Sequence, residues 1–592
     1  MNCMEDLLRY YEEELAGFRR EAAEFAKRYP KIASRLDLSA NESTDPHVER
    51  LIESFALLCT RARLRAEAKW PAVAQSALQI LLPDLLCPIP AMSIVRFELG
   101  PDQGKLETGF RVPRGSQLSS RPIAGEAYRF RTCFDVDLWP LTLTGVRLVP
   151  VLTGTALELT LRADQDISPD RLESLTIHLQ GSSSFRMYDV LASRVERVEV
   201  WCDGKKTGGG PGDLGSVNAT GLDDDQAALP VTRRTFAGFR LLREYLCMPE
   251  KFLFLKLVLP RGYRLDRLTQ GKTISIRLCL ADSAGILDRD LDKDAIQLGC
   301  TPIVNLFSQT AEPVLVNQKK TEYQVIPDVR RRGSREIYSI DEITTQPVGG
   351  DEPRRLLPLY GHDTAGGFQS GFWTMRRTAP SLDDDPIDAH ISLVDLSLDG
   401  GPQAIDVLTV RTTCTNLNLP SRMPWGNESG DFEAENIPVS RIRMLRKPTL
   451  RLPPPLGNKT EWALISHMSL QHLSLSEDGA LLLRRLLHAL DVTDRRAVAV
   501  QIDSISKIET GRAIAHLAIG GVTIPVPGTR IEVQLTEDAF VGGGAYLFGT
   551  VLDRFLSLYA SLNTFTQLRL TSPQRKGVVG NWPPRIGIQP VI

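Results

Sequence analysis

The stretch GFRLLREYLCMPEKFLFL, residues 238–255, is rich in large apolar side chains and contains no histidine, serine or aspartate. Four of these apolar residues are spaced as on one face of a helix: Leu241, Leu242, Tyr245 and Leu246. Pro249 cannot continue that helix. The pattern predicts a short helix from Phe239 to about Leu246, a break at Pro249 and a buried strand over 252–259. We therefore expect a core segment with a structural role.

The size and charge of the chain bound the classes to which it can belong. Its 592 residues are too many for one hydrophobic core and predict three or four domains. Lys plus Arg number 70 and Asp plus Glu number 72, so the formal net charge of −2 offers no chain-wide attraction to nucleic acid. The nine cysteines are scattered singly without a CxxC pair, which is typical of reduced, buried thiols.

The N-terminal sequence MNCMEDLLRYYEEELAGF carries acidic residues at once and lacks the basic start and apolar centre of a signal peptide. No window of the sequence approaches eighteen uninterrupted apolar residues. These features predict a cytoplasmic chain that does not span a membrane.

Residues 1–90 show helical periodicity. An apolar heptad seam ends before Pro30 and consists of Leu8, Tyr11, Leu15, Phe18, Ala22, Phe25 and Tyr29. A second helix is expected to begin at Asp45-Pro46, with an apolar face through Val48, Leu51, Phe55, Leu58 and Ala62. A third helix is expected over about 72–82, before Pro83. The seam could pack on its own domain or on another chain.

From Met92 the pattern changes to short alternating runs with Gly, Pro and Asp turns, such as SIVRFEL, LELTLRA, LTIHLQG and VERVEVWCDG. Helical signals return late in the chain in EWALISHMSLQHLSL, ALLLRRLLHAL and YLFGTVLDRFLSLYASL. We predict an α+β, multidomain protein with four parts. These are a helical region at 1–90, a β-rich domain at 91–315 with a flexible loop at 203–225, a second β-rich domain at 316–455, and a C-terminal α/β domain at 456–592.

Two glycine motifs invite a nucleotide or anion site. Gly271-Lys272-Thr273 resembles part of a P-loop, but Asp266 stands where the first glycine is needed and a strand-like sequence follows, so we expect a turn into a strand. The glycines at 542–544 precede a helix and could hold an anion, but the upstream Glu537 and Asp538 would repel it. A glycine-rich entry to a closely packed helix is the better interpretation.

Other candidate sites carry weak signals. His467 and His472 are five residues apart, which does not match the spacing of four in HExxH. The acids at 383–385 are typical of a solvated loop, and the arginines of DVRRRGSRE, residues 328–336, could meet a phosphate, meet an acidic partner, or form a solvated turn. No GxSxG elbow is present. None of these motifs amounts to a catalytic or metal-binding signal.

Several ordered segments resemble the TssF family (also called ImpG or VasA), a baseplate subunit of bacterial type VI secretion systems. They are LLRYYEEELAGFRREAAEFAKRYPKIASRL (7–36), DPHVERLIESFALL (45–58), CTPIVNLFSQTAEPV (300–314), TEYQVIPDVRR (321–331), CTNLNLPSRM (414–423), LISHMSLQHLSL (464–475), GTVLDRFLSLYASLNTFTQL (549–568) and WPPRIG (582–587). The opening stretch at 238–255 belongs to the same set. The resemblance spans nearly the whole chain, except for the Gly/Asp-rich 203–225.

The resemblance implies a structural wedge subunit and not an enzyme, with no catalytic site, no metal site, no cofactor and no small-molecule substrate. It implies that two TssF copies join one TssG chain, that this core carries TssK and TssE, and that wedges assemble around the VgrG spike hub. The baseplate would contact the inner-membrane complex, so its association with the membrane would be indirect. A β-rich hydrolase acting on glycans or peptides is the alternative, and it would need catalytic groups that converge from distant parts of the chain.

The resemblance also indicates whether the heptad seam packs on its own domain or on another chain. The family is expected to bundle helices from different chains, so the seam is predicted to pack in an intermolecular bundle. Its knobs, and thus the predicted partner interface, are Leu8, Tyr11, Leu15, Phe18 and Phe25.

Overall fold

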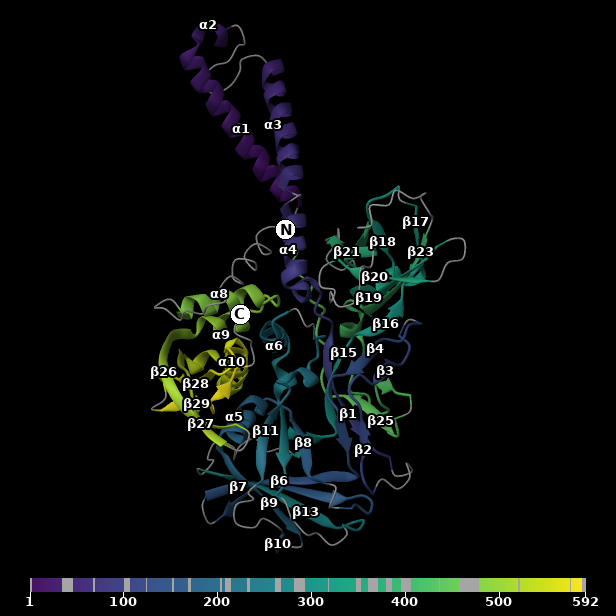
Figure 1. Ribbon diagram of the computed structural model, residues 1–592, viewed down its shortest axis with the longest axis vertical. Helices are drawn as coiled ribbons and strands as arrows, with labels where there is room; N and C mark the ends of the chain where they lie inside the picture. The colour runs from purple at the N-terminus through teal and green to yellow at the C-terminus, as the bar shows by residue number, and fades with distance from the viewer. Residues whose placement is uncertain are drawn as a thin grey trace. The chain divides into compact units, whose positions relative to one another are not determined.

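The computed structural model divides the chain into two compact units, which are described separately (Figure 1). One unit contains residues 1–78 and 456–462, and the other contains 79–455 and 463–592. The structure describes residues 3–34, 46–67, 70–100, 107–123, 125–151, 154–168, 172–202, 205–207, 215–231, 235–260, 268–281, 293–317, 319–347, 353–359, 371–378, 386–395, 406–435, 437–454, 456, 479–519, 522–574 and 577–587. The described residues form an N-terminal set of helices followed by several β-sheets and further helices, which confirms the α+β multidomain prediction.

The first unit is helical. It contains α1 (Cys3–Arg28), the short α2 (Pro30–Ala33) and α3 (Pro46–Glu67), and α4 (Trp70–Leu81) begins in it. The prolines act as expected, because Pro30 starts a new helical turn after α1, Pro46 stands at the first position of α3, and Pro83 follows α4 and opens the 3-10 turn η1 (Pro83–Leu86). The three predicted helices are therefore confirmed.

The stretch at 238–255 lies at the centre of the second unit. It forms α6 (Ala237–Cys247), the 3-10 turn η4 (Pro249–Phe252) and β12 (Phe254–Val258), which confirms the predicted helix, break and strand. Every residue of α6 from Gly238 to Cys247 is buried. Leu241 and Leu242 are fully buried, so the predicted core role is correct.

Charged side chains of this segment form a buried ionic network. The Glu244 carboxylate accepts hydrogen bonds from Lys251 Nζ at 2.5 Å, from Arg240 Nη1 at 3.1 Å, and from the backbone N–H groups of Ala228 and Leu229. Lys251 Nζ also donates to the Gly221 carbonyl at 2.8 Å. Burial raises the pKa of Glu244, but the two neighbouring cations outweigh burial and hold its pKa below the usual range. The carboxylate is therefore charged and fully partnered.

The second unit contains a closed barrel that joins distant parts of the sequence. Its strand order is β1 (Met92–Glu98), β15 (Cys300–Val304), β4 (Arg129–Thr132), β3 (Gln117–Ser120), β24 (Phe432–Glu433) and β25 (Arg441–Met444), and β25 closes on β1. Its interior includes Val95, Leu118, Phe130, Ile303, Phe432 and Ile442. The barrel thus takes strands from both segments expected to be separate β-rich domains.

The second unit also contains two antiparallel sheets, one of which includes β12 of the core segment. The first has the order β10 (Lys205–Thr207), β9 (Val195–Cys202), β13 (Thr273–Leu280), β7 (Gly154–Ala163) and β6 (Leu141–Val151). The second has the order β11 (Ser216–Thr220), β12, β8 (Ser174–Leu179) and β14 (Ile296–Leu298), while β2 (Phe110–Val112) pairs with β5 (Val136–Leu138). The expectation of a loop at 203–225 is wrong for β10, β11 and the turn η3 (Asp224–Gln226), because β10 and β11 complete the ladders of neighbouring strands.

A larger sheet follows along the chain. Its order is β16 (Phe307–Thr310), β23 (Asp406–Thr415), β19 (Glu336–Pro347), β20 (Arg354–Pro358), β21 (Gly371–Thr378), β22 (Asp388–Asp395) and β18 (Tyr323–Val325), and β17 (Val314–Val316) also pairs with β23. Elsewhere in the second unit, further short 3-10 turns connect the strands and helices, namely η5 (Lys293–Ala295), η6 (Val329–Ser334), η8 (Leu419–Arg422) and η9 (Glu537–Ala539). A buried ion pair, Arg451–Glu336, joins this sheet to the segment after β25.

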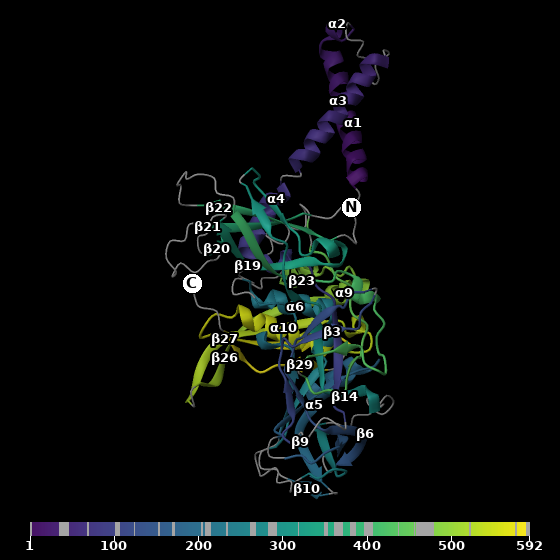
Figure 2. The same ribbon diagram turned by 90° about the vertical axis from the view of Figure 1, so that its right-hand side faces the viewer.

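The C-terminal part combines a sheet with helices. The sheet has the order β26 (Ile505–Ile519), β27 (Val522–Leu535), β28 (Phe565–Thr571) and β29 (Val578–Asn581), with β30 (Arg585–Ile586) paired to β28. The helices of this part are α8 (Gly479–Leu490), α9 (Arg496–Asp503) and α10 (Ala545–Tyr559). The helix α5 (Ser184–Arg194), from earlier in the chain, contacts α10. In Figure 2, the β26–β27 ribbon lies at the edge of this group. The predicted helices at 480–490 and 546–562 are confirmed, and the one at 461–475 lies outside the described residues.

Candidate interaction surface on the N-terminal hairpin

The helices α1 and α3 form an antiparallel hairpin, which we call the α1–α3 hairpin. Polar contacts connect them along their length. Arg19 Nη2 lies 2.6 Å from Glu49 Oε1, and Arg63 Nη1 lies 3.0 Å from Glu14 Oε1. The guanidinium carbon of Arg63 also lies 4.6 Å from the centre of the Tyr10 ring. These contacts involve partly exposed side chains, so each contributes little to the free energy of folding.

The apolar contact between the two helices is small. The rings of Phe18 and Phe55 meet edge to face with their centroids 5.3 Å apart. Ala56 and Thr60 are the described residues of α3 that are fully buried, and both are small. A two-helix pair with so few buried large side chains cannot cover its own apolar faces.

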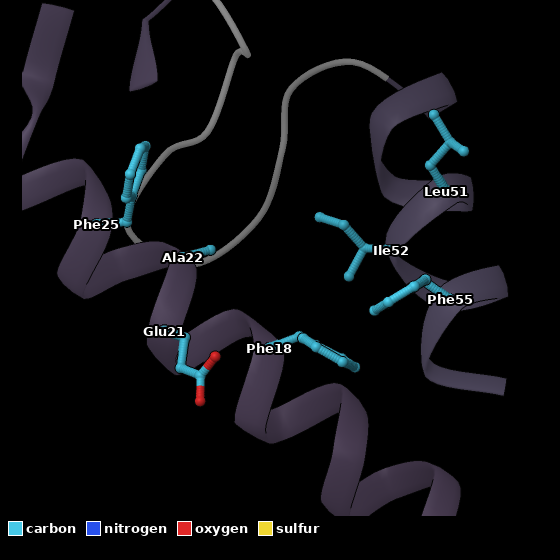
Figure 3. A pocket seen from close by; sticks show the side chains of 7 residues that line it. All are labelled: Phe18, Glu21, Ala22, Phe25, Leu51, Ile52 and Phe55. Carbon is cyan, nitrogen blue, oxygen red and sulfur yellow. The ribbon is translucent and has the colours of Figure 1, made fainter. Parts of the chain in front are cut away.

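An open apolar groove runs between the helices (Figure 3). Its volume is about 580 Å³, and its lining is Phe18, Glu21, Ala22, Phe25, Leu51, Ile52 and Phe55. Phe18 of α1 and Ile52 and Phe55 of α3 point toward one another across it, as the close view shows. Leu51 is 69% exposed and Phe55 is 55% exposed. Large apolar side chains gathered in this way are typical of a surface that binds another protein.

The structure divides the five predicted interface residues into two sets. Phe18 and Phe25 line the groove, and Phe25 is 37% exposed. Leu8, Tyr11 and Leu15 lie outside the groove on the same helix, where Leu8 is 57% exposed and the other two are half-buried. Part of the seam therefore packs on α3 of the same chain, while other parts stay accessible.

Sequence reasoning missed the contribution of α3 to this surface. Leu51, Ile52 and Phe55 form one wall of the groove, but they were not among the predicted interface residues. The signal was present, because Leu51 and Phe55 belong to the apolar face predicted for this helix. What the sequence could not give was the pairing of α3 with α1, which decides which residues remain uncovered.

The two glycine motifs have structural roles. Gly271 has a left-handed backbone with a φ of 85°, and β13 starts at Thr273, which confirms the turn into a strand. The glycines at 542–544 lead into α10, whose first N–H groups donate to the carboxylate of Asp189 on α5, at 2.8 Å from Gly544 N. A Cβ at Gly543 would come within 2.8 Å of the Arg186 backbone nitrogen, so this entry is closely packed, as expected.

The remaining candidates add no site. Three arginines of the 328–336 segment face carboxylates of the same chain, with Arg331 and Arg335 near Glu126 and Arg332 near Asp388. His467, His472 and the acids at 383–385 lie outside the described residues. Within the described ranges, no group of three His, Cys, Asp or Glu side chains is placed to hold a metal ion. Among the same residues, no helix has both the length and the apolar character that crossing a membrane requires.

Comparison with known proteins identifies the family. A family model described as "Type VI secretion system, TssF" matches residues 3–589. The chain is 31% identical to the type VI secretion system component TssF1 of Pseudomonas aeruginosa, and the alignment covers 99% of each chain.

Two solved structures agree with this match. A chain in the type VI TssK–TssF–TssG baseplate subcomplex, determined by cryo-electron microscopy, is similar with a TM-score of 0.72 and 25% identity, over 90% of this chain and 98% of that one. A chain in a type VI baseplate complex shares the fold with a TM-score of 0.57 and 22% identity, over 99% of this chain and 100% of that one. The protein therefore belongs to the TssF family of the type VI secretion system, a family of structural baseplate proteins and not of enzymes.

Proposed function

We propose that this chain is a wedge scaffold of a type VI baseplate that assembles with TssG and TssK. The observation that carries the proposal is its likeness to a chain solved within a TssK–TssF–TssG subcomplex, at a TM-score of 0.72 and over 98% of that chain. The length of the match matters, because a scaffold needs all of its binding surfaces in one chain. The family assignment replaces the alternative of a β-rich hydrolase.

We propose that the α1–α3 hairpin carries one of these binding surfaces. The predicted interface residues are Leu8, Tyr11, Leu15, Phe18 and Phe25, to which the structure adds Leu51, Ile52 and Phe55. Burial of apolar surface is worth roughly 25 cal/mol per Å², so a partner helix laid over this groove would gain substantial free energy. An open apolar groove of this kind would accept an amphipathic helix, and we assign that helix to TssG.

The proposal extends to the rest of the machine. A second TssF copy would share the bundle, TssE would bind the assembled core, and wedges would surround the VgrG spike hub. The baseplate would lie in the cytoplasm at the inner membrane, in contact with the membrane complex through other subunits. The family resemblance supports these placements, and the proposed role requires no cofactor, nucleic acid or small-molecule substrate.

The test is co-purification with TssG after Leu51→Asp. Leu51 is 69% exposed, so the charge should leave folding intact, but it would be desolvated inside a helix bundle. We expect the variant to lose at least tenfold of the TssG that the unmodified chain retains in a pull-down from co-expressing cells. Leu15→Asp, on the predicted seam, should act in the same direction.

The matched control is Leu315→Asp, which introduces the same charge at a side chain of β17 that is 57% exposed. It should retain TssG in full. Normal TssG recovery with both Leu51→Asp and Leu15→Asp would show that the hairpin is not the TssG surface.

A further inference from the structure

The five-stranded sheet β10–β9–β13–β7–β6 has one apolar face and one charged face, and its strands lie together in Figure 1. Successive side chains of a strand point to opposite faces of the sheet. The apolar face carries a row of buried residues that pair across three strands, namely Leu159, Ile276 and Val200. The neighbouring row, Glu158–Arg277–Glu199, therefore lies on the other face.

Glu158 of β7 holds two arginines on this charged face. Its carboxylate accepts hydrogen bonds from Arg147 Nε of β6 at 2.6 Å and from Arg277 Nε of β13 at 2.9 Å. Burial raises the pKa of Glu158, but the hydrogen bonds from the two arginines outweigh burial and hold its pKa below the usual range. The carboxylate is therefore charged and shared between two cations.

Glu199 of β9 has a similar environment. It accepts hydrogen bonds from Lys206 Nζ at 2.9 Å, from Arg197 Nε at 3.0 Å and from Trp201 Nε1 at 3.1 Å. Burial raises the pKa of Glu199, but these three hydrogen bonds hold it below the usual range. We call the four cations around Glu158 and Glu199 the basic row, namely Arg147, Arg277, Arg197 and Lys206. With its two carboxylates, the row has a net charge of +2.

The basic row turns its cations toward solvent and keeps its carboxylates covered. The side chains of Arg147 and Lys206 are 68% and 45% exposed, whereas that of Glu158 is 2% exposed. Arg147 and Arg277 use Nε for Glu158, and their Nη groups donate no hydrogen bond to any residue that the structure describes. The guanidinium carbon of Arg277 lies 3.9 Å from the centre of the Trp201 ring, which fixes its plane. A guanidinium held in this way presents its two Nη groups to a carboxylate from outside.

The spacing of the row indicates the shape of the ligand. One strand, β13, separates Glu158 from Glu199, so the two groups of cations lie two strand spacings apart, which is about 10 Å. In an α-helix, residues seven positions apart lie on one face and are separated by about 10.5 Å. In an extended peptide, residues on one face are separated by about 7 or 13 Å. The spacing therefore favours an acidic helix that crosses the strands.

The size of the charge argues against nucleic acid as the ligand. Proteins that bind nucleic acid through its backbone make about six to ten phosphate contacts, and a row with a net charge of +2 offers too few. The chain as a whole has a formal net charge of −2, which adds no attraction to a polyanion. Carboxylates at two places on a partner protein match the row in number and in sign.

We propose that the basic row binds an acidic helix of a partner protein, with carboxylates seven residues apart that meet the cations around Glu158 and Glu199. The proposal goes beyond the wedge function, because it assigns a second binding surface that is formed by different residues from the α1–α3 hairpin. Ion pairs at a solvent-exposed surface are individually weak and are screened by salt. The contact should therefore add to a larger interface, and its strength should fall as the salt concentration rises.

The test is fluorescence anisotropy of a labelled, alanine-rich helical peptide with glutamates seven residues apart, titrated with the full chain. Arg147→Gln/Lys206→Gln removes the two most exposed cations of the row, while each buried carboxylate keeps one arginine partner, so the variant should melt as the unmodified chain does. We expect the double variant to bind the peptide about fivefold more weakly. Equal binding by the folded double variant would overturn the proposal.

The matched control is Arg355→Gln/Arg411→Gln. These two arginines are each 62% exposed and share the carboxylate of Glu342 on another sheet. The control removes the same number of charges, so it has the same effect on the overall charge of the chain. It should bind the peptide as the unmodified chain does, and an equal loss of affinity in both double variants would mean that net charge, and not the basic row, attracts the peptide.

Two further probes test the class of ligand. Moving one glutamate from the seventh to the fifth position places the two carboxylates on different faces of the helix, so this peptide should bind more weakly. A single-stranded DNA of equal formal charge should also bind more weakly, and tighter binding of the DNA would assign the row to nucleic acid instead. No binding of the first peptide up to about 1 mM would likewise overturn the proposal. TssG recovery reports on the α1–α3 hairpin, so failure here is distinguishable from failure of the proposed function.

Discussion

The helices α1 and α6 both have strong apolar faces, but they have opposite surroundings. In α6 every residue from Gly238 to Cys247 is buried, including the charged Arg240, Arg243 and Glu244. In the α1–α3 hairpin, uncharged leucines and phenylalanines remain in contact with solvent. The comparison teaches that burial follows from the elements stacked around a helix and not from the composition of the helix itself.

The charged groups of the two regions show the same contrast. The side chains of Glu244 and Lys251 are both fully buried, and Lys251 Nζ lies 2.5 Å from Glu244 Oε2, so water does not screen the attraction between the two charges. Arg63 and Glu14 form a similar pair at 3.0 Å, but their side chains are 40% and 27% exposed. A buried charge depends on its partner far more than an exposed charge does, because water cannot replace the partner.

The largest effect is expected from Glu244→Gln. This change keeps the volume but leaves the Lys251 ammonium buried without a carboxylate, which should destabilise the surrounding structure by about 3–5 kcal/mol. Hydrogen exchange of peptides that cover 237–258, followed by mass spectrometry, measures the loss of protection. The double variant Glu244→Gln/Lys251→Met should regain part of it. Equal exchange in the single variant and the unmodified chain would show that the pair is not needed.

Leu242→Ala should have the next largest effect. The side chain is fully buried in α6, and its truncation leaves a cavity that should cost about 2–5 kcal/mol. The expected phenotype is a lower midpoint of urea unfolding, together with less soluble protein. The same truncation at the exposed Leu51 of the α1–α3 hairpin serves as the reference, and an equal loss at both positions would erase the contrast between the regions.

The smallest effect is expected from Arg63→Met. It breaks the ion pair with Glu14, but both groups can be hydrated, so the change in stability should stay below about 1 kcal/mol. Hydrogen exchange in peptides covering α1 should be nearly unchanged. A loss of protection comparable to that of Glu244→Gln would mean that the hairpin depends on its surface charges as α6 depends on its buried ones.

Local features of the fold were predictable because they depend on neighbouring residues. Apolar spacing predicted α1, α3, α6 and α10, and prolines predicted where α1 and α6 give way to the next element. The turn at Gly271 was predicted because Asp266 stands where a P-loop needs a glycine, and the packed helix entry at 542–544 was predicted because Glu537 and Asp538 precede it. The family followed from many ordered segments along the whole chain, a pattern far more specific than any one motif.

Only the tertiary structure decided which distant residues meet. The barrel closes by pairing β1 with β25, more than 340 residues later in the chain, and the anion at the start of α10 is the carboxylate of Asp189. Likewise, Glu244 and Lys251 have the sequence signature of a solvated surface, yet they are buried together. The sequence by itself determined the periodicity and breaks of the elements, because these depend on residues near one another, and it determined the family, because ordered segments recur along the whole chain. The closure of the barrel, the burial of Glu244 with Lys251 and the exposure of apolar residues in the groove of the α1–α3 hairpin were decided by contacts between distant parts of the chain. The free energies of these contacts depend on a three-dimensional geometry that no local sequence pattern contains.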